Sequence, residues 1–333
     1  MSSTRSRYIV GVDLGGTNIV AGAMPDDGSR EIAFRSALTR SSDGLDAVVE
    51  RMIQMIEDVI AETSAETGAM REDFLGVGVG APGPMDRDKG IVITAPNLGW
   101  KMVPLRDRIH TATGLRVSLD NDANCATLGE AWIGAAKGAR NVIGVTIGTG
   151  IGGGIIIDGR LYHGSSHVAG EIGHMTIDST GRRCSCGNYG CLEAYASGTA
   201  IAERAREALA NETSGVLLEL CGRQLEQVTA QMVYTAAKNG DPVAIDVVRE
   251  TARFLGAGIG ALLNVLNPEV VVLAGGVVNA GEALFAPLKA EVRRRAFAPA
   301  VNGCRIVPGL LGSSAGVVGA VAAFKEETGS PLT

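Results

Sequence analysis

Apolar residues recur along the chain at two spacings, which alternate from one end to the other. Short runs of apolar or β-branched residues between turn residues are typical of buried strands, whereas apolar side chains every three or four positions are typical of helices. The clearest helical spacing lies between Leu45 and Ala65, where apolar residues recur from Val48 to Ile60. We therefore expect strands and helices to alternate along the chain.

The pattern predicts two sets of elements. Strands are predicted at Tyr8–Asp13, Asn18–Ala23, Glu31–Ser36, Phe74–Val79, Leu115–Leu119, Val142–Thr146, Ile151–Ile157, Val270–Leu273 and Cys304–Val307. Helices are predicted at Leu45–Ala65, Leu105–Thr113, Ala123–Gly134, Ser197–Ala210, Gln231–Lys238, Pro242–Leu266, Ala283–Arg295 and Ser314–Phe324. Alternation of this kind indicates layered α/β architecture.

A weak internal repeat indicates two related halves. Asp13–Asn18 and Thr146–Gly154 each read as a strand, a turn of Gly and Thr, and a second strand. We place the division near Asp120, with an N-terminal α/β domain at 1–120 and a larger α/β domain at 121–313. The helix at about 314–326 is expected to pack back on the first domain.

Composition narrows the class of protein. The 333 residues have a formal net charge of -6 and are 46% hydrophobic, values that fit a soluble globular enzyme of about two domains and oppose a nucleic-acid-binding protein. The longest apolar candidate, Phe254–Leu266, is shorter than the ~18–20 residues that span a bilayer. The polar start, Met1–Arg7, has no apolar stretch of a secretory signal, so we expect a cytoplasmic protein.

Two glycine-rich turns are candidates for phosphate binding. In the first, Gly15 and Gly16 bring backbone N–H groups near an anion, Thr17 adds a hydroxyl, and Asp13 is placed to hold Mg²⁺ through water. An ordinary hairpin turn is the alternative for this stretch.

The second turn is denser in glycine, and five of the seven residues from Gly148 to Gly154 are Gly. Glycine weakens a strand pair, so ligand binding is the better explanation, through backbone amides that hold phosphate without Lys or Arg. The stretch is no Walker A loop, because no Gly-Lys-Ser/Thr follows. It is no dinucleotide-binding turn either, because Ile155–Ile157 continues as strand.

Two strand ends carry further candidates. Gly275 and Gly276 follow the apolar strand Val270–Leu273, at an edge where α/β folds admit ligands, although a tight turn explains them equally well. Asp122, in Asn121–Asn124 between a strand and a helix, offers a carboxylate that can accept a proton from a substrate hydroxyl. From these residues alone, a helix N-cap is the preferred role for Asp122.

One histidine and three cysteines form a metal-ligand set. His174, Cys184, Cys186 and Cys191 supply the donors of a tetrahedral zinc site, and glycines between the cysteines let a short loop wrap one ion. Four protein ligands leave no open position, so the predicted zinc is structural. Free thiols or a disulfide are the weaker alternative in a reducing compartment.

Several polar residues near these loops are candidates for reading sugar hydroxyls. They are Asn97, Glu171, His174 and Glu193. From composition alone, most of them read as solvated surface groups, and His163 and His167 are given no role.

These motifs together resemble the ROK family (repressor, open reading frame, kinase), and within it the bacterial glucokinases. The matching segments follow the family's order and spacing along most of the chain: Asp13–Asn18, Ala95–Trp100, Asn121–Asn124, Thr146–Gly154, Ala169–His174, Cys184–Glu193 and Leu273–Gly276. Each segment alone is weakly specific, whereas the combined Glu-x-x-His and Cys-x-Cys-x4-Cys signature is highly specific.

The resemblance implies an actin/hexokinase-like (ribonuclease H-like) fold of two α/β domains with ligands in the cleft between them. Asp122 matches the family's catalytic base, which reverses the preference for a cap. The positions that match its sugar contacts are Asn97, Asn121, Asp122, Glu171, His174 and Glu193. The positions that match its phosphate and nucleotide loops are Asp13, Gly15, Gly16, Thr17, Gly148, Thr149, Gly150, Gly152, Gly153, Gly275 and Gly276. Its zinc ligands match His174, Cys184, Cys186 and Cys191.

The implied activity is ATP-dependent phosphorylation of glucose at the 6-hydroxyl, the first step of glucose use in glycolysis, with Mg²⁺ bound with ATP. A homodimer or a higher homo-oligomer is implied as well. Kinases of this family for N-acetylmannosamine, fructose or mannose are the alternative, and Ala95–Trp100 modestly favours glucose. Polyphosphate as the donor stays open, although no basic groove is evident.

Two other classes of function compete with a kinase. The first is a non-catalytic sugar-sensing regulator, opposed by a first strand near Tyr8 that leaves no room for an N-terminal helix-turn-helix and by the retained Asp122 and Gly148–Gly153. The second is an actin-like or chaperone-like ATPase, which the zinc signature opposes.

Overall fold

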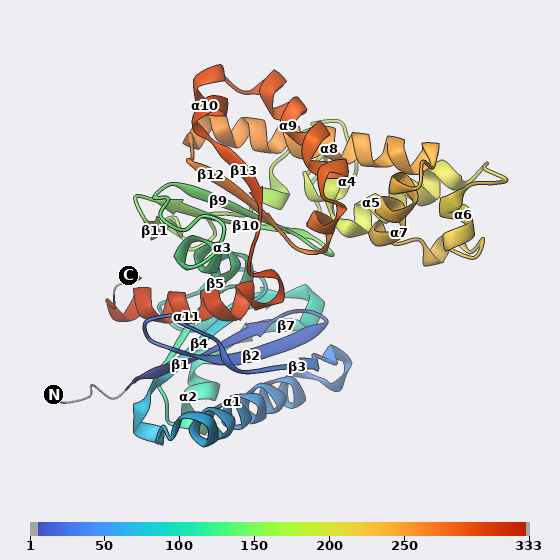
Figure 1. Ribbon diagram of the computed structural model, residues 1–333. Helices are drawn as coiled ribbons and strands as arrows, with labels where there is room; N and C mark the ends of the chain where they lie inside the picture. Colours follow the sequence, from blue (N-terminus) through green and yellow to red (C-terminus); the bar gives the residue numbers. More distant parts are fainter. Residues whose placement is uncertain (1–5, 331–333) are drawn as a thin grey trace. The chain divides into compact units, whose positions relative to one another are not determined.

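Two five-stranded sheets organise residues 6–330, the part of the chain that the computed structural model describes (Figure 1). The described residues group into two compact units. The first contains residues 6–139, 154–170 and 310–330, and the second contains residues 140–153 and 171–309. The chain passes from one unit to the other four times, and one of these passages lies within strand β10 (Ile151–Ile157).

The first unit is built on a mixed sheet in the order β3-β2-β1-β4-β8. Its strands are β1 (Tyr8–Leu14), β2 (Asn18–Pro25), β3 (Ile32–Leu38), β4 (Phe74–Ala81) and β8 (Val117–Asn121). The strands β1 to β3 are antiparallel, while β4 is parallel to β1 and β8 is parallel to β4. The carboxyl ends of β1, β4 and β8 therefore lie at the same edge of the sheet.

Helices cover both faces of this sheet. Helices α1 (Leu45–Thr67) and α2 (Leu105–Thr113) share one buried apolar cluster with the side chains of one face. Helices α3 (Asp122–Trp132) and α11 (Ala315–Thr328) pack against each other and against the sheet. A small three-stranded sheet, β5 (Met85–Asp86), β6 (Ile91–Ala95) and β7 (Trp100–Val103), completes the unit.

Glycine lets α11 approach the sheet backbone. Gly11 of β1 and Gly78 of β4 are neighbours in register. A Cβ on Gly11 would lie 2.3 Å from the carbonyl oxygen of Val317, and one on Gly78 would lie 1.9 Å from that of Ala320. Real Cβ atoms do not come so close to backbone, so any larger residue would push α11 away. The glycine-rich strand β4 thus has a packing role that its sequence alone did not indicate.

The second sheet has the order β11-β10-β9-β12-β13. Its other strands are β9 (Val142–Ile147), β11 (Arg160–Leu161), β12 (Val270–Ala274) and β13 (Arg305–Pro308). The helices of the second unit are α4 (Glu193–Ala196), α5 (Gly198–Leu209), α6 (Val216–Leu220), α7 (Ala230–Lys238), α8 (Pro242–Leu266), α9 (Glu282–Arg295) and α10 (Ala298–Gly303). Their apolar faces share one buried cluster with β9 and β12.

The longest helix, α8, has clear local signals at both ends. The Asp241 side chain accepts a hydrogen bond from the backbone N–H of Ala244 at 2.9 Å, and Pro242 occupies the first turn. At the other end Asn267 adopts the left-handed conformation, with φ of 46°. The predicted helix over Pro242–Leu266 is confirmed. No helix of the described residues is long and apolar enough to cross a membrane.

Candidate functional site

The turn between β1 and β2 is exposed to solvent, and hydrogen bonds to its backbone fix its conformation. The backbone N–H of Gly15 donates to the carbonyl oxygen of Asn18 at 2.9 Å, and the Thr39 hydroxyl donates to the carbonyl oxygen of Gly15 at 2.7 Å. Thr39 is buried, whereas Gly16 and Thr17 are exposed. The predicted phosphate-binding residues therefore form a turn that hydrogen bonds fix in place and whose Gly16 and Thr17 are exposed to solvent.

Asp13 lies behind this turn in a buried position. Burial, together with the smaller effect of the nearby Asp122 charge, raises the pKa of its carboxyl group to about 7. A Cβ on Gly316, in the first turn of α11, would lie 2.2 Å from Asp13 Oδ2. A bound cation would favour the ionised form of this carboxylate, so the position fits the predicted magnesium-binding role.

At the end of β8, the structure assigns the helix N-cap to one residue of the pair Asn121 and Asp122. Asn121, and not Asp122, is the N-cap of α3: its Oδ1 accepts hydrogen bonds from the backbone N–H groups of Ala123 at 2.9 Å and Asn124 at 3.2 Å. The cap role that the residues alone favoured for Asp122 is therefore wrong. Asp122 is the first residue of the helix and lies close enough to Asp13 to raise its pKa.

Asn97 belongs to the same unit as these residues. It lies in a short 3₁₀ turn, Pro96–Leu98, which ends at Gly99 in the left-handed conformation with φ of 66°. A Cβ on Gly16 would lie 3.4 Å from the Cβ of Asn97. The structure thus places the predicted sugar-binding Asn97 directly against the first glycine-rich turn.

In the second unit, the turn between β9 and β10 is held by the start of α5. The backbone N–H of Gly198 donates to the carbonyl oxygen of Gly148 at 2.8 Å, and the Thr199 hydroxyl donates to the carbonyl oxygen of Thr149 at 2.9 Å. Gly148 does not have a positive φ, and a Cβ placed on it would meet nothing within 4 Å. The absence of a side chain at Gly148 therefore leaves open space in front of the backbone, which is the property that phosphate binding requires.

A pocket of about 640 Å³ lies beside this turn and is large enough for a nucleoside. It contains the predicted Gly148, Thr149 and Gly276. Its remaining lining residues are Ile147, Gly198, Thr199, Ala202, Arg206, Val228, Thr229, Ala230, Gln231, Tyr234, Thr235, Lys238, Val277, Asn279 and Ala280. Many of these come from α5 and α7, which the sequence analysis did not connect to the site.

Gly275 has a different reason to be glycine. It has φ of +92°, and a Cβ there would lie 2.4 Å from the carbonyl oxygen of Ile147. The residue closes the turn after β12 against β9. Gly276, next in the chain, faces the pocket and has nothing within 4 Å of a built Cβ.

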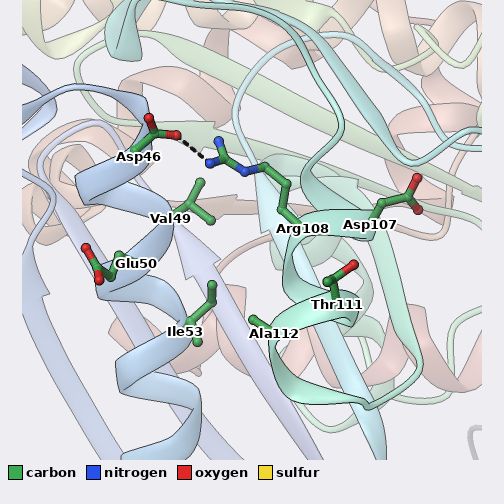
Figure 2. A pocket seen from close by; sticks show the side chains of 8 residues that line it. All are labelled: Asp46, Val49, Glu50, Ile53, Asp107, Arg108, Thr111 and Ala112. Carbon is green, nitrogen blue, oxygen red and sulfur yellow. Dashed lines mark hydrogen bonds and ion pairs between the residues drawn. The ribbon is translucent and has the colours of Figure 1, made fainter.

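Another hollow of the first unit, about 540 Å³, lies between α1 and α2 (Figure 2). Its lining includes the charged side chains Asp46, Glu50, Asp107 and Arg108, and an ion pair joins Asp46 to Arg108. None of the predicted site residues lines it, so we assign it no part in the chemistry.

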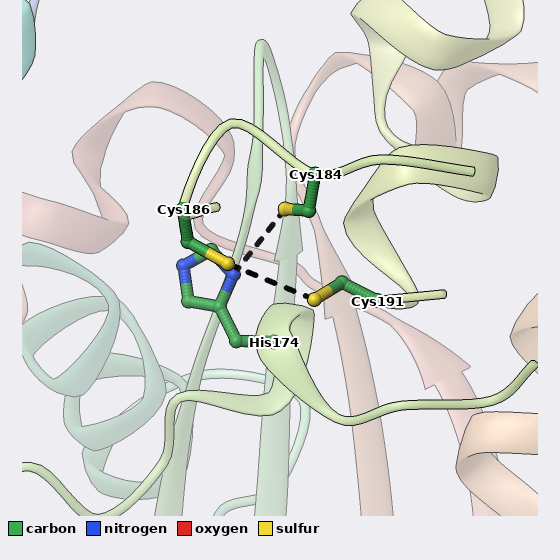
Figure 3. Close-up of side chains that lie close together, drawn as sticks. All are labelled: His174, Cys184, Cys186 and Cys191. Atoms are coloured by element: carbon green, nitrogen blue, oxygen red, sulfur yellow. Dashed lines mark hydrogen bonds between the residues drawn. The ribbon is translucent and has the colours of Figure 1, made fainter. Parts of the chain in front are cut away.

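The four predicted metal ligands converge (Figure 3). One ligand atom from each of His174, Cys184, Cys186 and Cys191 lies within 4.8 Å of the other three. Cys184 Sγ is 3.7 Å from His174 Nδ1, and Cys186 Sγ is 3.8 Å from Cys191 Sγ. Sulfurs joined in a disulfide are only about 2 Å apart, whereas a tetrahedral ion with bonds of about 2.3 Å separates them by about 3.8 Å. The arrangement is compatible with a Cys₃His metal site.

The loop that carries the cysteines requires glycine at its bends. The backbone N–H of Cys184 donates to the carbonyl oxygen of Asn188 at 2.8 Å, and Gly187 between them has φ of +94°. Gly190 has φ of +72°, and a Cβ there would lie 1.6 Å from the carbonyl oxygen of Asp178. These bends bring the cysteines around one point.

Glu193 joins the metal loop to the glycine-rich turn. Its Oε2 accepts a hydrogen bond from the backbone N–H of Ile151 at 2.8 Å, and its Oε1 accepts one from the Ser185 hydroxyl at 3.3 Å. A Cβ on Gly150 would lie 2.4 Å from Glu193 Oε2. Gly150 is therefore needed for Glu193 as well as for any phosphate, a connection that the sequence analysis missed.

Glu171 lies one 3₁₀ turn before His174, which is one of the four predicted metal ligands. The backbone N–H of His174 donates to the carbonyl oxygen of Glu171 at 3.1 Å. Burial raises the pKa of the Glu171 carboxyl group, and the charge of Glu193 adds to this rise. Glu171, His174 and Glu193 thus lie close together beside the cysteine loop, within the second unit.

Comparisons with known proteins agree with these motifs. A sequence model of the ROK family matches residues 9–327. A glucokinase of Halalkalibacterium halodurans is 39% identical over 326 residues, covering 97% of each chain. The xylose repressor of Bacillus subtilis is 31% identical and covers 95% of this chain and 76% of the repressor. The crystal structure of a ROK family glucokinase from Streptomyces griseus in complex with glucose and AMPPNP has a TM-score of 0.81 and 36% identity, over 94% of this chain and 98% of that one.

Proposed function

Because the chain belongs to the ROK family and has its two-domain, actin/hexokinase-like α/β fold, we propose that it is an ATP-dependent glucokinase. The observation that supports this most is the 39% identity to a named glucokinase, since it covers 97% of both chains and hence both units. The reaction transfers the γ-phosphoryl group of ATP to the 6-hydroxyl of glucose.

Asp122 is the proposed general base. It accepts the proton of the 6-hydroxyl while O6 bonds to the γ-phosphorus, and the bond from that phosphorus to the bridging oxygen breaks to release ADP. The position of Asp122 supports this role: Asn121 is the N-cap of α3, and Asp122 is the first helical residue, where its Oδ1 accepts a hydrogen bond from the backbone N–H of Ala123 at 2.8 Å. The residues proposed to bind the sugar are Asn97, Asn121, Asp122, Glu171, His174 and Glu193.

The nucleotide is proposed to bind the two glycine-rich turns and the 640 Å³ pocket. The backbone of Gly15, Gly16 and Thr17 and that of Gly148–Gly153 offer N–H groups to phosphate oxygens. Adenosine is assigned to the pocket, with Gly275 and Gly276 at its edge. Mg²⁺ bound with ATP neutralises phosphate charge, and Asp13 is the residue proposed to hold it through water.

We propose zinc as the occupant of the Cys₃His site. Three thiolates and an imidazole form a donor set that suits Zn²⁺, and four protein ligands make the role structural. Since Glu193 follows Cys191 closely, zinc would hold in place a residue that we assign to the sugar.

We also propose that the protein acts in the cytoplasm, in the first step of glycolysis, and as a homo-oligomer. The free cysteines of the metal site fit a reducing compartment, and ATP is the proposed donor. The oligomer is carried over from the family resemblance and would be checked by light scattering.

A sugar-sensing regulator is the second candidate, favoured by the 31% identity to the xylose repressor. The test is ADP release measured with glucose, mannose, fructose, N-acetylmannosamine and xylose, each with ATP or polyphosphate. We expect the highest kcat/KM with glucose and ATP. Sugar binding measured by calorimetry with no phosphoryl transfer to any sugar would instead support the regulator.

A further inference from the structure

We propose that Arg87, Asp120 and His163 form a buried network that positions Asp122 for phosphoryl transfer. This inference rests on the proposed kinase function. The three are positioning residues, because none of them is assigned a contact with substrate. All three lie in the first unit, and none was among the site residues expected from the sequence.

Asp120 is the centre of the network. It lies on β8 two residues before Asp122 and is 1% exposed. Its Oδ2 accepts a hydrogen bond from His163 Nε2 at 2.8 Å and forms an ion pair with Arg87 Nε at 3.0 Å. Its Oδ1 accepts hydrogen bonds from the backbone N–H of Asn121 at 2.8 Å and from Asn124 Nδ2 at 2.9 Å. One oxygen therefore binds the network, and the other binds the start of α3.

The hydrogen bonds define the protonation of His163. Its Nδ1 is 3.3 Å from Nη1 of Arg87, which can only donate, so Nδ1 is the acceptor. Nε2 then carries the proton and donates it to Asp120. A neutral imidazole thus joins the guanidinium to the carboxylate, using one nitrogen for each.

Arg87 compensates the charge of Asp120. Burial opposes ionisation of Asp120, but the hydrogen bond from His163 and the charge of Arg87 outweigh it and lower the pKa. Asp122 already has one buried carboxyl group nearby, that of Asp13. The ion pair therefore provides a rigid anchor beside the base without adding a net charge there.

The anchor acts on the residues on either side of Asp122. Asn121 is held through its backbone N–H by Asp120, and its own side chain caps Ala123 and Asn124. Asp122 stands between these fixed points. A displacement of the reacting groups by about 1 Å costs about 10²-fold in rate, so loss of the anchor should lower kcat more than substrate affinity.

The experiment compares His163→Asn with the matched variant His167→Asn. Asparagine is too short to join Asp120 to Arg87. His167 packs its ring edge-on against that of His163, with centroids 6.3 Å apart, but its ion pair is with Asp88 and not with Asp120 or Arg87, so it controls for loss of a neighbouring ring. We expect kcat of His163→Asn to fall about 10–100-fold with both KM values within about twofold, and His167→Asn to keep the wild-type kcat. His163→Gln, which supplies a donor and an acceptor, should recover part of the loss.

Backbone hydrogen exchange at Asn121 provides a measurement that needs no activity. We expect faster exchange at this amide in His163→Asn and wild-type exchange in His167→Asn. An unchanged kcat in His163→Asn, a loss confined to KM, or an equal loss in both variants would overturn the proposal. If the wild type phosphorylates no sugar, the proposed function fails, and unchanged exchange at Asn121 would then overturn the network as well. If His163→Asn does not fold, Arg87→Lys replaces it with the same expected directions.

Discussion

Asn121 and Asp122 are adjacent in the chain but have different roles at the start of α3. The Asn121 side chain accepts hydrogen bonds from two backbone N–H groups of the first turn, whereas Asp122 is the first helical residue and the candidate base, with one carboxylate oxygen bonded to the N–H of Ala123. The residue types alone could not separate these roles, because Asp and Asn cap helices about equally well. The distinction depends on where β8 ends, and a one-residue shift of a strand end is beyond what a hydrophobic pattern can predict.

The two residues should therefore respond differently to substitution. We expect Asp122→Asn to lower kcat by about 10²–10⁴-fold at nearly unchanged stability, because an amide cannot accept the proton. Asn121→Ala should cost about 1 kcal/mol of the free energy of unfolding, through loss of the cap, and Asn121→Asp should keep it. Steady-state kinetics and urea unfolding of the three variants check this. Near-normal turnover of Asp122→Asn would remove it as the base.

The raised pKa of Asp13 should make the free energy of unfolding fall as the pH rises. Its folded pKa of about 7 lies above the ordinary value of 3.8, so the folded state holds a proton that the unfolded state releases. The stabilising contribution is complete below about pH 4 and is lost as pH rises through 7. Asp13→Asn should thus raise the free energy of unfolding of the ligand-free protein more at pH 8 than at pH 5. The difference between the two pH values should be roughly 2–3 kcal/mol, since one pKa unit corresponds to about 1.36 kcal/mol.

Urea unfolding at the two pH values, without nucleotide or Mg²⁺, measures this difference. Asp13→Asn should also lose most of its activity, since an amide holds a hydrated cation less well than a carboxylate. The same gain in stability at both pH values would show that Asp13 is ionised throughout, contrary to the raised pKa.

At the scale of elements, two loops of the second unit are connected by one side chain. Glu193 accepts a hydrogen bond from the β9–β10 turn and one from the cysteine loop. The sequence predicted both loops, because dense glycine and a Cys₃His set are strong local signals. It did not predict their connection, nor the part of α7 that lines the pocket. Gln231 and Lys238 occupy the exposed face of that helix, where the apolar period carries no information.

Gly148 and Gly150 should differ although they stand two residues apart. Gly148→Val adds a side chain in open space, so the fold should be kept while the KM for ATP rises at least about tenfold and glucose affinity changes little. Gly150→Val would collide with the Glu193 carboxylate and should weaken glucose binding too. Calorimetry with glucose and with an ATP analogue separates the two. Unchanged nucleotide affinity in Gly148→Val would make the turn a simple hairpin.

The cysteine loop should depend on its metal. Cys186 is the exposed ligand, so Cys186→Ser perturbs packing least while removing one donor. We expect loss of bound zinc and a rise in the KM for glucose of about 10–100-fold, because the loop holds Glu193. Cys304→Ser, outside the site, is the control. Full activity in metal-free Cys186→Ser would show that the loop needs no ion.

At the scale of the whole molecule, the apolar pattern predicted an α/β protein with two cores, and the two sheets agree with it. The short strands β5 to β7 were missed, because their two to five residues show no regular alternation of buried and exposed positions. Periodicity also cannot tell which sheet a helix covers. The domain boundary at residue 120 therefore stays a prediction. In the structure, the first compact unit also contains α3, residues 154–170 and α11.

Binding of the proposed substrate should stabilise the whole chain. Glucose at about 100 times its Kd adds about 2.7 kcal/mol to the free energy of unfolding, which corresponds to a rise of roughly 4 °C in Tm for a protein of 333 residues. Xylose, which lacks the carbon that carries the 6-hydroxyl, should produce a smaller shift. Differential scanning calorimetry with the two sugars measures this. An equal or larger shift with xylose would favour the regulator over the kinase.

The glycine contacts of α11 bear on the order in which the protein matures during synthesis. Gly11 and Gly78 lie on strands made early, whereas the helix that covers them spans Ala315–Thr328. A ribosome must therefore translate the entire second unit, which ends at residue 309, before α11 can pack on the first sheet. The first unit is thus the earlier one to be started and the later one to be finished.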